Sequence, residues 1–244
     1  MENSVSSAAL NAAREQLDAA EAAREVILLQ HIANGVIIDS RTVQIAPDVV
    51  IAPGAVILTG TILRGRTVIG ENCEIGPNSM IRDCVLGNGC VANASQLNQA
   101  QFGDNVNIGP FAYVRPGSVV GDGCKVGDFV ELKNSTIGEG TKISHLTYVG
   151  DSDVGGHVNF GCGTVTVNYD GTSKFRTVIG DHAFIGCNTN LVSPVKLGDR
   201  AFTAAGTTVT KDVPAGALSV ARSRQTNLEG WNDRRRAAHE KDEK

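Results

Sequence analysis

A six-residue period dominates this 244-residue sequence and limits the folds it can adopt. Large aliphatic or aromatic residues recur at every sixth position, and the residue four places later is small or β-branched. Because side chains alternate between the two faces of a strand, both positions point to the same side. The first unbroken series of large residues is Ile45, Ile51, Ile57, Leu63, Ile69, Ile75 and Ile81. After a one-residue slip at Leu86 and an irregular stretch, the series resumes at Phe102 and closes at Val209.

Such a period predicts an all-β fold, the left-handed parallel β-helix of hexapeptide repeats. Three hexapeptides, or about 18 residues, make one triangular coil, and successive coils stack at the spacing of hydrogen-bonded strands. Left-handed winding is a recognised exception to the usual right-handed crossover. We expect the β-helix over residues 36–220, preceded by a linker-like segment, 1–35, and followed by a charged tail, 221–244. Within the first segment, residues 6–33 predict a helix that ends before Gly35.

Composition argues against several classes of partner. The net charge of −4 and the pI of about 5.7 give no reason to expect nucleic acid or an anionic membrane. No apolar run reaches the roughly 18 residues of a membrane span, so we expect no membrane insertion. The first residues lack the pattern of a signal peptide. The six cysteines form no C-x-x-C pair, which favours a reduced, cytoplasmic setting.

In a repeat protein, residues that break the pattern are the best candidates for function. The largest break is the segment 167–178, because the step from Thr166 to Ile179 is more than twice the length of one hexapeptide. The additional residues predict a loop at one corner of the β-helix, and loops on a rigid scaffold often carry function.

A column of side chains follows from counting coils. The hexapeptides that start at positions 143, 160, 185 and 203 follow one another by one coil each, once the loop within the longest step is set aside. The residues two positions into these hexapeptides should therefore stack, one per coil, on the outside: His145, Cys162, Cys187 and Ala205. A narrow slot of small side chains suits a pantetheine arm, and a neutral imidazole at its end suits a general base. The alternative is that His145 is a solvated or structural residue of a turn.

A second pair of polar residues stacks on the neighbouring face. Arg115 and Lys133 stand one coil apart, at positions where the repeat usually has glycine. Two cations on adjacent coils can clamp a phosphate. Since Arg64 and Arg82 are placed in the same way, a solvated basic ridge is the alternative.

From about residue 32 to 231 the chain resembles the C-terminal acetyltransferase domain of the bacterial bifunctional N-acetylglucosamine-1-phosphate uridyltransferase/glucosamine-1-phosphate N-acetyltransferase. The strings that carry the resemblance are IGPFAYVRPG, VGDFVELKNS, HLTYVGD, NFGCGTVTVNYDGTSKFRTVIGD, AAGTTVTKDVP and RQTNLEGW. It implies homotrimers with active sites between subunits, acetyl-CoA as co-substrate, no metal, and a role in UDP-N-acetylglucosamine biosynthesis.

The resemblance also implies roles for individual residues. The base falls on His145, an acidic residue near it on Glu131, and an oxyanion donor on Asn168. Ligands of the sugar phosphate fall on Arg115, Lys133, Tyr148, Asn159 and Lys174. Contacts to acetyl-CoA fall on Cys162, Tyr169, Cys187, Ala205 and Arg222.

This sequence departs from the family at two kinds of position. Cys162 and Cys187 stand where the family has alanine and serine, so a thiol replaces a hydroxyl donor in the slot. No glycine-rich nucleotide-binding segment precedes residue 40, and we therefore expect no uridyltransferase activity.

The expected reaction is acetyl transfer from acetyl-CoA to the amine of glucosamine 1-phosphate, with His145 accepting a proton. Three alternatives stay open at this point: an acyltransferase with another amino-sugar acceptor, such as a nucleotide-linked one; a zinc enzyme that uses the stacked pair His157 and His182; and a scaffold without catalysis. A zinc site usually needs at least three protein ligands, which argues against the second.

Overall fold

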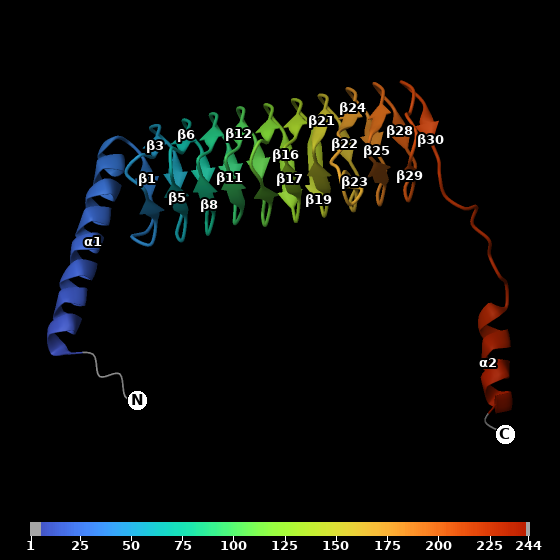
Figure 1. Ribbon diagram of the computed structural model, residues 1–244, viewed down its shortest axis with the longest axis horizontal. Coiled ribbons are helices and arrows are strands. Elements are labelled where there is room, and N and C mark those ends of the chain that lie inside the picture. The colour runs from blue at the N-terminus through green and yellow to red at the C-terminus, as the bar shows by residue number, and fades with distance from the viewer. Residues whose placement is uncertain (1–5, 243–244) are drawn as a thin grey trace.

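The computed structural model describes residues 6–242 and shows an elongated solenoid with a helix beyond each end (Figure 1). The ends of the predicted linker segment and tail, residues 1–5 and 243–244, lie outside the described residues. The chain winds into the expected left-handed parallel β-helix of about ten coils, with its strands in three parallel sheets. Each sheet forms one side of a triangular cross-section.

We name the sheets A, B and C in the order in which a coil passes through them. Sheet A contains β1 (Ile37–Ile38), β4 (Val56–Ile57), β7 (Glu74–Ile75), β10 (Val91–Ala92), β13 (Asn107–Ile108), β16 (Lys125–Asp128), β19 (Lys142–His145), β22 (Asn159–Phe160), β25 (Phe184–Ile185), β28 (Phe202–Thr203) and β30 (Leu218–Ser219). Sheet B contains β2 (Gln44–Ile45), β5 (Ile62–Arg64), β8 (Met80–Arg82), β11 (Gln96–Asn98), β14 (Tyr113–Val114), β17 (Glu131–Lys133), β20 (Tyr148–Gly150), β23 (Val165–Val167), β26 (Asn190–Val192) and β29 (Thr208–Val209). Sheet C contains β3 (Val50–Ile51), β6 (Val68–Ile69), β9 (Val85–Leu86), β12 (Gln101–Phe102), β15 (Val119–Val120), β18 (Thr136–Ile137), β21 (Ser152–Val154), β24 (Thr177–Ile179) and β27 (Val195–Leu197).

The core consists of the two inward positions of each hexapeptide. Large residues such as Ile75 and Ile143 are fully buried and stack on their counterparts in the next coil. The small residues lie at the corners, where their hydroxyl or thiol groups bond to backbone carbonyls. For example, Thr141 donates to the carbonyl of Gly155 on the next coil at 2.9 Å. The small position thus fills space and also satisfies a corner carbonyl that the ladders leave free.

The stretch that the sequence leaves irregular, between Leu86 and Phe102, is a regular part of the solenoid. Ala92 and Leu97 occupy its two large inward positions and pair in register with both neighbouring coils. The pattern is hidden because Ala92 is small and because the steps to Leu97 and then to Phe102 are one position shorter than a full hexapeptide. The coil therefore accepts these shorter steps as well as full ones.

The helices lie at the two ends of the solenoid (Figure 1). Helix α1 (Ser7–Ala33) agrees with the predicted helix and begins after Ser6, whose hydroxyl accepts from the backbone of Ala9. Most of α1 is exposed, and Leu28 is its one buried residue. Helix α2 (Trp231–Asp242) lies in the charged tail. Neither helix has the length and apolarity needed to cross a bilayer, within residues 6–242.

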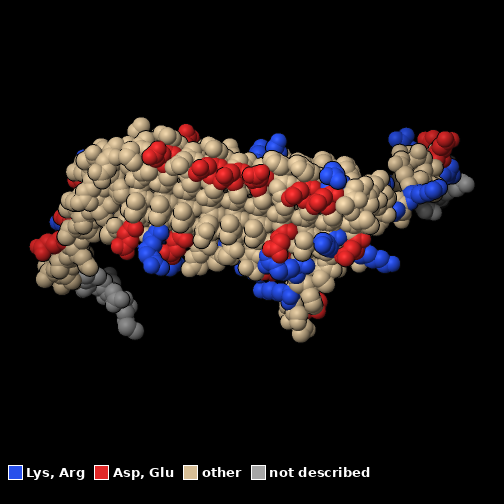
Figure 2. Space-filling model, turned by 90° about the horizontal axis from the view of Figure 1, so that it is seen from above, with Lys and Arg blue, Asp and Glu red and all other residues tan. Residues whose placement is uncertain are grey.

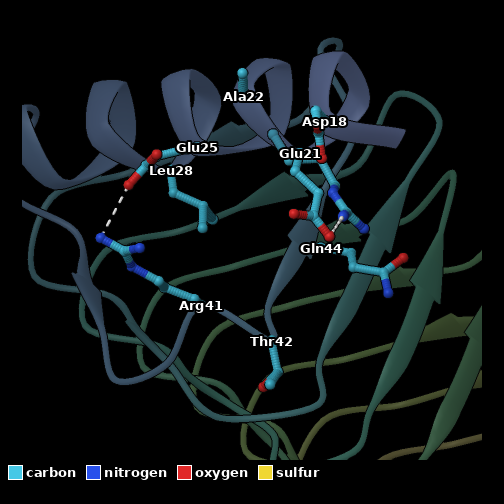
Figure 3. A pocket seen from close by; sticks show the side chains of 9 residues that line it. Asp18, Glu21, Ala22, Glu25, Leu28, Arg41, Thr42 and Gln44 are labelled. Atoms are coloured by element: carbon cyan, nitrogen blue, oxygen red, sulfur yellow. Dashed lines mark ion pairs between the residues drawn. The ribbon is translucent and has the colours of Figure 1, made fainter. Parts of the chain in front are cut away.

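An open pocket lies where α1 approaches the first coil (Figure 3). Arg41 from the coil pairs with Glu25 of the helix at 3.0 Å, and Leu28 points toward the coil below. The lining residues include neither histidine nor cysteine, so the pocket offers no candidate base or nucleophile of the kind predicted from the sequence.

Candidate active site

The predicted column of small residues is present in the structure. Ile143 pairs with Phe160, Phe160 with Ile185, and Ile185 with Thr203, on four successive strands of sheet A. The residues two positions further therefore line up at the corner between sheets A and B: His145, Cys162, Cys187 and Ala205. The sequence-based count of coils is confirmed.

His145 is held by a carboxylate from the preceding coil. Asp128 pairs with His145 in the strand register, and its Oδ1 lies 2.5 Å from the Nδ1 of the imidazole. The hydrogen bond from His145 holds the pKa of Asp128 below its usual value, so the carboxylate is ionised near neutral pH. A carboxylate at Nδ1 fixes the ring and leaves Nε2 to act on a substrate.

Beyond His145, the coils of the column pack backbone against backbone. Any Cβ at Gly161 would lie 2.4 Å from the backbone nitrogen of Cys187, so glycine is required for the coils to pack this closely. Cys162 is half-buried, while Cys187 and Ala205 are exposed. At the far end, the side chain of Arg222 passes 3.8 Å from where a Cβ of Gly206 would lie, next to Ala205. The column is therefore a narrow strip with an imidazole at one end and a guanidinium at the other.

The predicted phosphate ligands other than Asn159 gather toward the other end of sheet B, at its corner with sheet C. Lys133 donates to Asp151 at 3.1 Å, and Asn134 donates to the same carboxylate at 2.6 Å. Asp151 is 5% exposed. Burial raises its pKa, but the hydrogen bonds from Asn134, Lys133 and Asn168 more than compensate, so the pKa lies below the usual value. Asp151 is the anionic centre on which this corner is built.

Asn168 and Tyr148 complete this cluster. The amide of Asn168 donates to Asp151 at 2.5 Å and lies 3.5 Å from the hydroxyl of Tyr148. Gly150 stands in the column of Lys133, and a Cβ there would lie 2.2 Å from the Tyr148 hydroxyl. The missing side chain thus leaves room for the tyrosine beside Lys133.

Three cations gather on the outside of the cluster. Burial lowers the pKa of Lys133, but the hydrogen bond to Asp151, the contact with Lys174 and the charge of Asp151 together outweigh this, and the pKa lies above the usual value. The neighbouring ammonium of Lys133 lowers the pKa of Lys174, and the charge of Arg115 acts in the same direction. Mutual repulsion of this kind is relieved when an anion such as phosphate binds between the cations.

The carboxylate of Glu131 belongs to the cationic group and not to His145. Its Oε1 accepts from Arg115 at 2.8 Å, and the two side chains are about equally exposed. Within the chain, the acidic partner of His145 is Asp128, a residue that the resemblance does not indicate.

The structure thus sorts the predicted residues into two groups at two corners. The first corner carries His145, Cys162, Cys187, Ala205 and Arg222, and Asn159 lies beside it on sheet A. The second carries Arg115, Glu131, Lys133, Tyr148, Asn168 and Lys174, with the exposed Tyr169 in the adjoining loop. The strands of sheet B lie between the two corners.

Comparisons with known proteins find a similarity to hexapeptide transferases. The family model for the bacterial transferase hexapeptide (six repeats) matches residues 100–134 and 176–211. The bifunctional protein GlmU of Clostridium beijerinckii is 51% identical over 93% of this chain and 50% of its own length. The same protein from Clostridium perfringens is 55% identical over 84% of this chain and 46% of its own length. The chain belongs to the hexapeptide transferases. It spans about half the length of these curated relatives.

The likeness to solved structures is much weaker. The UDP-N-acetylglucosamine acyltransferase of Bacteroides fragilis is 16% identical to this hexapeptide transferase, with a TM-score of 0.38 over 81% of this chain and 77% of that one.

The loop at residues 167–178 interrupts the hexapeptide repeat but leaves the register between neighbouring strands intact. Thr166 pairs with Leu191 on the next coil although the whole loop lies between them in the sequence. The loop closes on itself through a bridge between Tyr169 and Lys174, and Asp170 accepts from the backbone of Thr172 and Ser173. The repeat is therefore extended outward at the corner without displacing the coils.

The histidine pair of the zinc alternative stacks at a third corner. The rings of His157 and His182 lie 5.1 Å apart, and His157 approaches Glu139 at 3.7 Å. No group of three or more histidine, cysteine or acidic side chains with metal-binding geometry occurs within residues 6–242.

Sequence reasoning missed two carboxylates of this hexapeptide transferase. Asp128 stands two positions into the hexapeptide of Val126, so extending the column by one coil would have found it. Asp151 gives no such signal, because an aspartate in the string GDSD looks like an ordinary turn residue. The side chains that bond to it come from the two coils on either side of its own.

Proposed function

We propose that this hexapeptide transferase is an acetyl-CoA-dependent N-acetyltransferase that converts glucosamine 1-phosphate to N-acetylglucosamine 1-phosphate, a step of UDP-N-acetylglucosamine biosynthesis in the cytoplasm. The observation that carries the proposal is the imidazole of His145, oriented by Asp128, at the end of a column of small residues. The identity of 51% to a bifunctional GlmU over nearly the whole chain supports the choice of reaction.

The column at the first corner takes the acyl donor. Its floor is backbone, and its side chains from Cys162 to Ala205 are small, so a slender pantetheine arm can lie along the coils. Arg222 at the far end supplies a cation for the phosphates of coenzyme A. This orientation brings the thioester to the end of the column that His145 occupies.

The cations of the second corner hold the acceptor. Arg115, Lys133 and Lys174 bind the sugar phosphate, and Tyr148 binds the sugar. Nε2 of His145 removes a proton from the amine as it attacks the thioester carbon, and Asp128 stabilises the imidazolium that forms. The thiolate of coenzyme A leaves and takes up a proton. Binding both substrates in a fixed orientation supplies much of the rate.

Because the two corners are apart in one chain, the complete site lies between subunits of a homotrimer. An exposed apolar ridge beside His145 supports this assembly. Phe111, Phe129 and Leu146 stack along the same corner, and all three are more than half exposed. Each has a positive φ, a costly conformation for a bulky residue. Packing such a ridge against a second copy removes apolar surface from water.

Release of free thiol from acetyl-CoA tests the proposal, with glucosamine 1-phosphate, glucosamine 6-phosphate and UDP-linked amino-sugars as acceptors. We expect turnover with glucosamine 1-phosphate alone. Preference for a nucleotide-linked amino-sugar would show that the enzyme uses the alternative acceptor. The absence of thiol release with every acceptor would refute acyl transfer.

A further inference from the structure

The corner column contains two thiols on adjacent coils that the reaction does not use. All six cysteines are free. Cys73, Cys84, Cys90 and Cys124 are buried in the core, whereas Cys162 is half-buried and Cys187 is exposed. The two accessible thiols are therefore the two that stand in the same column.

The backbone fixes these two residues as direct neighbours. Phe160 and Ile185 pair in register, and Gly161 donates to the carbonyl of Ile185 at 2.7 Å. Immediately after the pair, the backbone nitrogen of Asn188 donates to the carbonyl of Cys162 at 2.8 Å. Hydrogen bonds thus hold the coils together on both sides of the cysteines.

This spacing suits a disulfide. Adjacent strands lie about 4.8 Å apart, and disulfides join Cα atoms that are roughly 4.4–6.8 Å apart. Because both side chains leave the same corner toward solvent, rotation about their Cα–Cβ bonds can bring the sulfurs together without a shift of the backbone.

We propose that Cys162 and Cys187 form a surface dithiol that closes to a disulfide across two coils by exchange with small-molecule disulfides. The more exposed thiolate of Cys187 attacks one sulfur of the small disulfide, forming a mixed disulfide and releasing one thiolate. The thiolate of Cys162 then attacks the Cys187 sulfur and expels the second. Two protein thiols are oxidised, one small disulfide is reduced to two thiols, and the two protons end on the released thiols.

Closure has a consequence that rests on the proposed function. The disulfide would stand in the middle of the slot for the pantetheine arm, between His145 and Ala205. The oxidised chain should then bind acetyl-CoA less well, and reduction should restore binding. The acyl donor site would thereby respond to the ratio of thiol to disulfide around the enzyme.

Oxidised glutathione is the probe for the first experiment, applied to the full native chain. After acid quenching, unfolding and alkylation, mass spectrometry should find four alkylated cysteines and a cross-linked peptide that joins Cys162 to Cys187. Cys162→Ala should instead retain one glutathione on Cys187, because the second thiol is missing. Cys124→Ala, which removes a core thiol, should still form the cross-link and serves as the matched control.

Two results would overturn the dithiol. One is a wild-type chain that keeps a glutathione adduct to the same extent as Cys162→Ala. The other is a chain whose two thiols stay reduced under conditions that oxidise a free dithiol of dithiothreitol. Both readouts are independent of activity, so they do not depend on the reaction being acetyl transfer.

A calorimetric titration with acetyl-CoA then compares the reduced and oxidised forms of the same wild-type preparation. We expect binding at least about tenfold weaker after oxidation and full recovery with dithiothreitol. A cross-link that forms without any change in affinity would confirm the dithiol and contradict the placement of the pantetheine slot.

Discussion

At the scale of single residues, His145 and Asp128 form the most direct link between the geometry and a reaction. The carboxylate reaches Nδ1 from the coil below, so the imidazole is held by a contact that the stacking of β16 on β19 creates. The pair has the arrangement of a general base and its orienting group. Its separate parts can be tested by substitution.

Replacing His145 by alanine should lower kcat by about 10²–10⁴-fold, the usual contribution of a positioned base. The small side chain leaves the coil unchanged, so light scattering should give the same oligomeric mass as for the wild type. Thiol release under saturating substrates measures the effect. Unchanged turnover would remove His145 from the mechanism.

Asp128→Asn should lower kcat less, by about ten- to a hundredfold, because an amide can still accept a hydrogen bond but does not stabilise an imidazolium. The KM for both substrates should stay within a factor of about two, since the proposed site places neither substrate against Asp128. Asp48→Asn, at an exposed aspartate near the first coil, is the control. A higher KM with a normal kcat would assign Asp128 to substrate binding instead.

At the scale of elements, the loop and the adjoining strands depend on the buried carboxylate of Asp151. It accepts hydrogen bonds from Lys133 at the end of β17, from Asn134 just after it, and from Asn168 after β23, on the coils to either side of its own. An ionised, hydrogen-bonded carboxylate of this kind connects three coils at one corner. Its removal should therefore affect stability as well as the cations it positions.

Asp151→Asn should lower the free energy of unfolding at pH 7 by roughly 1.5–3 kcal/mol. The NH2 group of the new amide would face N–H donors that now bond to the carboxylate. The folded-state pKa of Asp151 lies below the reference value of 3.8, so its contribution is complete above that pH and is lost as pH falls through the lower folded value. Thermal melts should show a large difference at pH 7 that shrinks below about pH 3.8. A difference that grows on acidification would contradict this sign.

The packing of one coil on the next can be tested with a matched pair of glycines. Gly161→Ala places a Cβ within 2.4–2.8 Å of backbone atoms of Gly186 and Cys187, whereas at Gly156 the nearest backbone atom would be 3.3 Å away. Neither glycine has a positive φ. We expect Gly161→Ala to cost about 1–3 kcal/mol in denaturant unfolding and Gly156→Ala distinctly less. Equal losses of unfolding free energy in the two variants would show that the coils can move apart.

Much of this architecture can be predicted from the sequence, because in a repeat the spacing between two residues determines whether they stack on successive coils. Once the coil length is known, His145 and Cys162 must stack, and they do. The stretch around Ala92 was missed because a small residue and shorter steps hide the period. The distance between the two corners was also missed, since counting coils gives the height of a residue along the solenoid but not how far apart two sides of the triangle lie.

At the scale of the whole molecule, exposed side chains are not spread evenly over the solenoid. Acidic side chains form a row along the body (Figure 2), and several corner aspartates accept backbone hydrogen bonds from the coil before them, as Asp122 does from Asp104 at 2.8 Å. The apolar ridge at the corner beside His145 has no such internal role. The aromatic rings of Phe111 and Phe129 stack 5.5 Å apart and contribute to no buried core.

Phe129→Glu should therefore convert the proposed trimers to monomers while the coils stay folded. A carboxylate in a packed apolar contact would lose its hydration without a partner. Light scattering after size exclusion measures the mass, and circular dichroism the fold. Val50→Glu, on the exposed side of sheet C opposite this corner, should leave the mass unchanged. A trimer that survives Phe129→Glu would place the subunit contact elsewhere.

The way the loop joins the solenoid has a consequence for how such a protein can change over time. Thr166 and Leu191 remain paired across a detour of the chain, because the added residues leave and re-enter at one vertex. Insertions or substitutions in that loop alter what lies beside Lys133 and leave the column from His145 to Ala205 in place. If the proposed sites are correct, selectivity for the acceptor can change during evolution while binding of the acyl donor is retained.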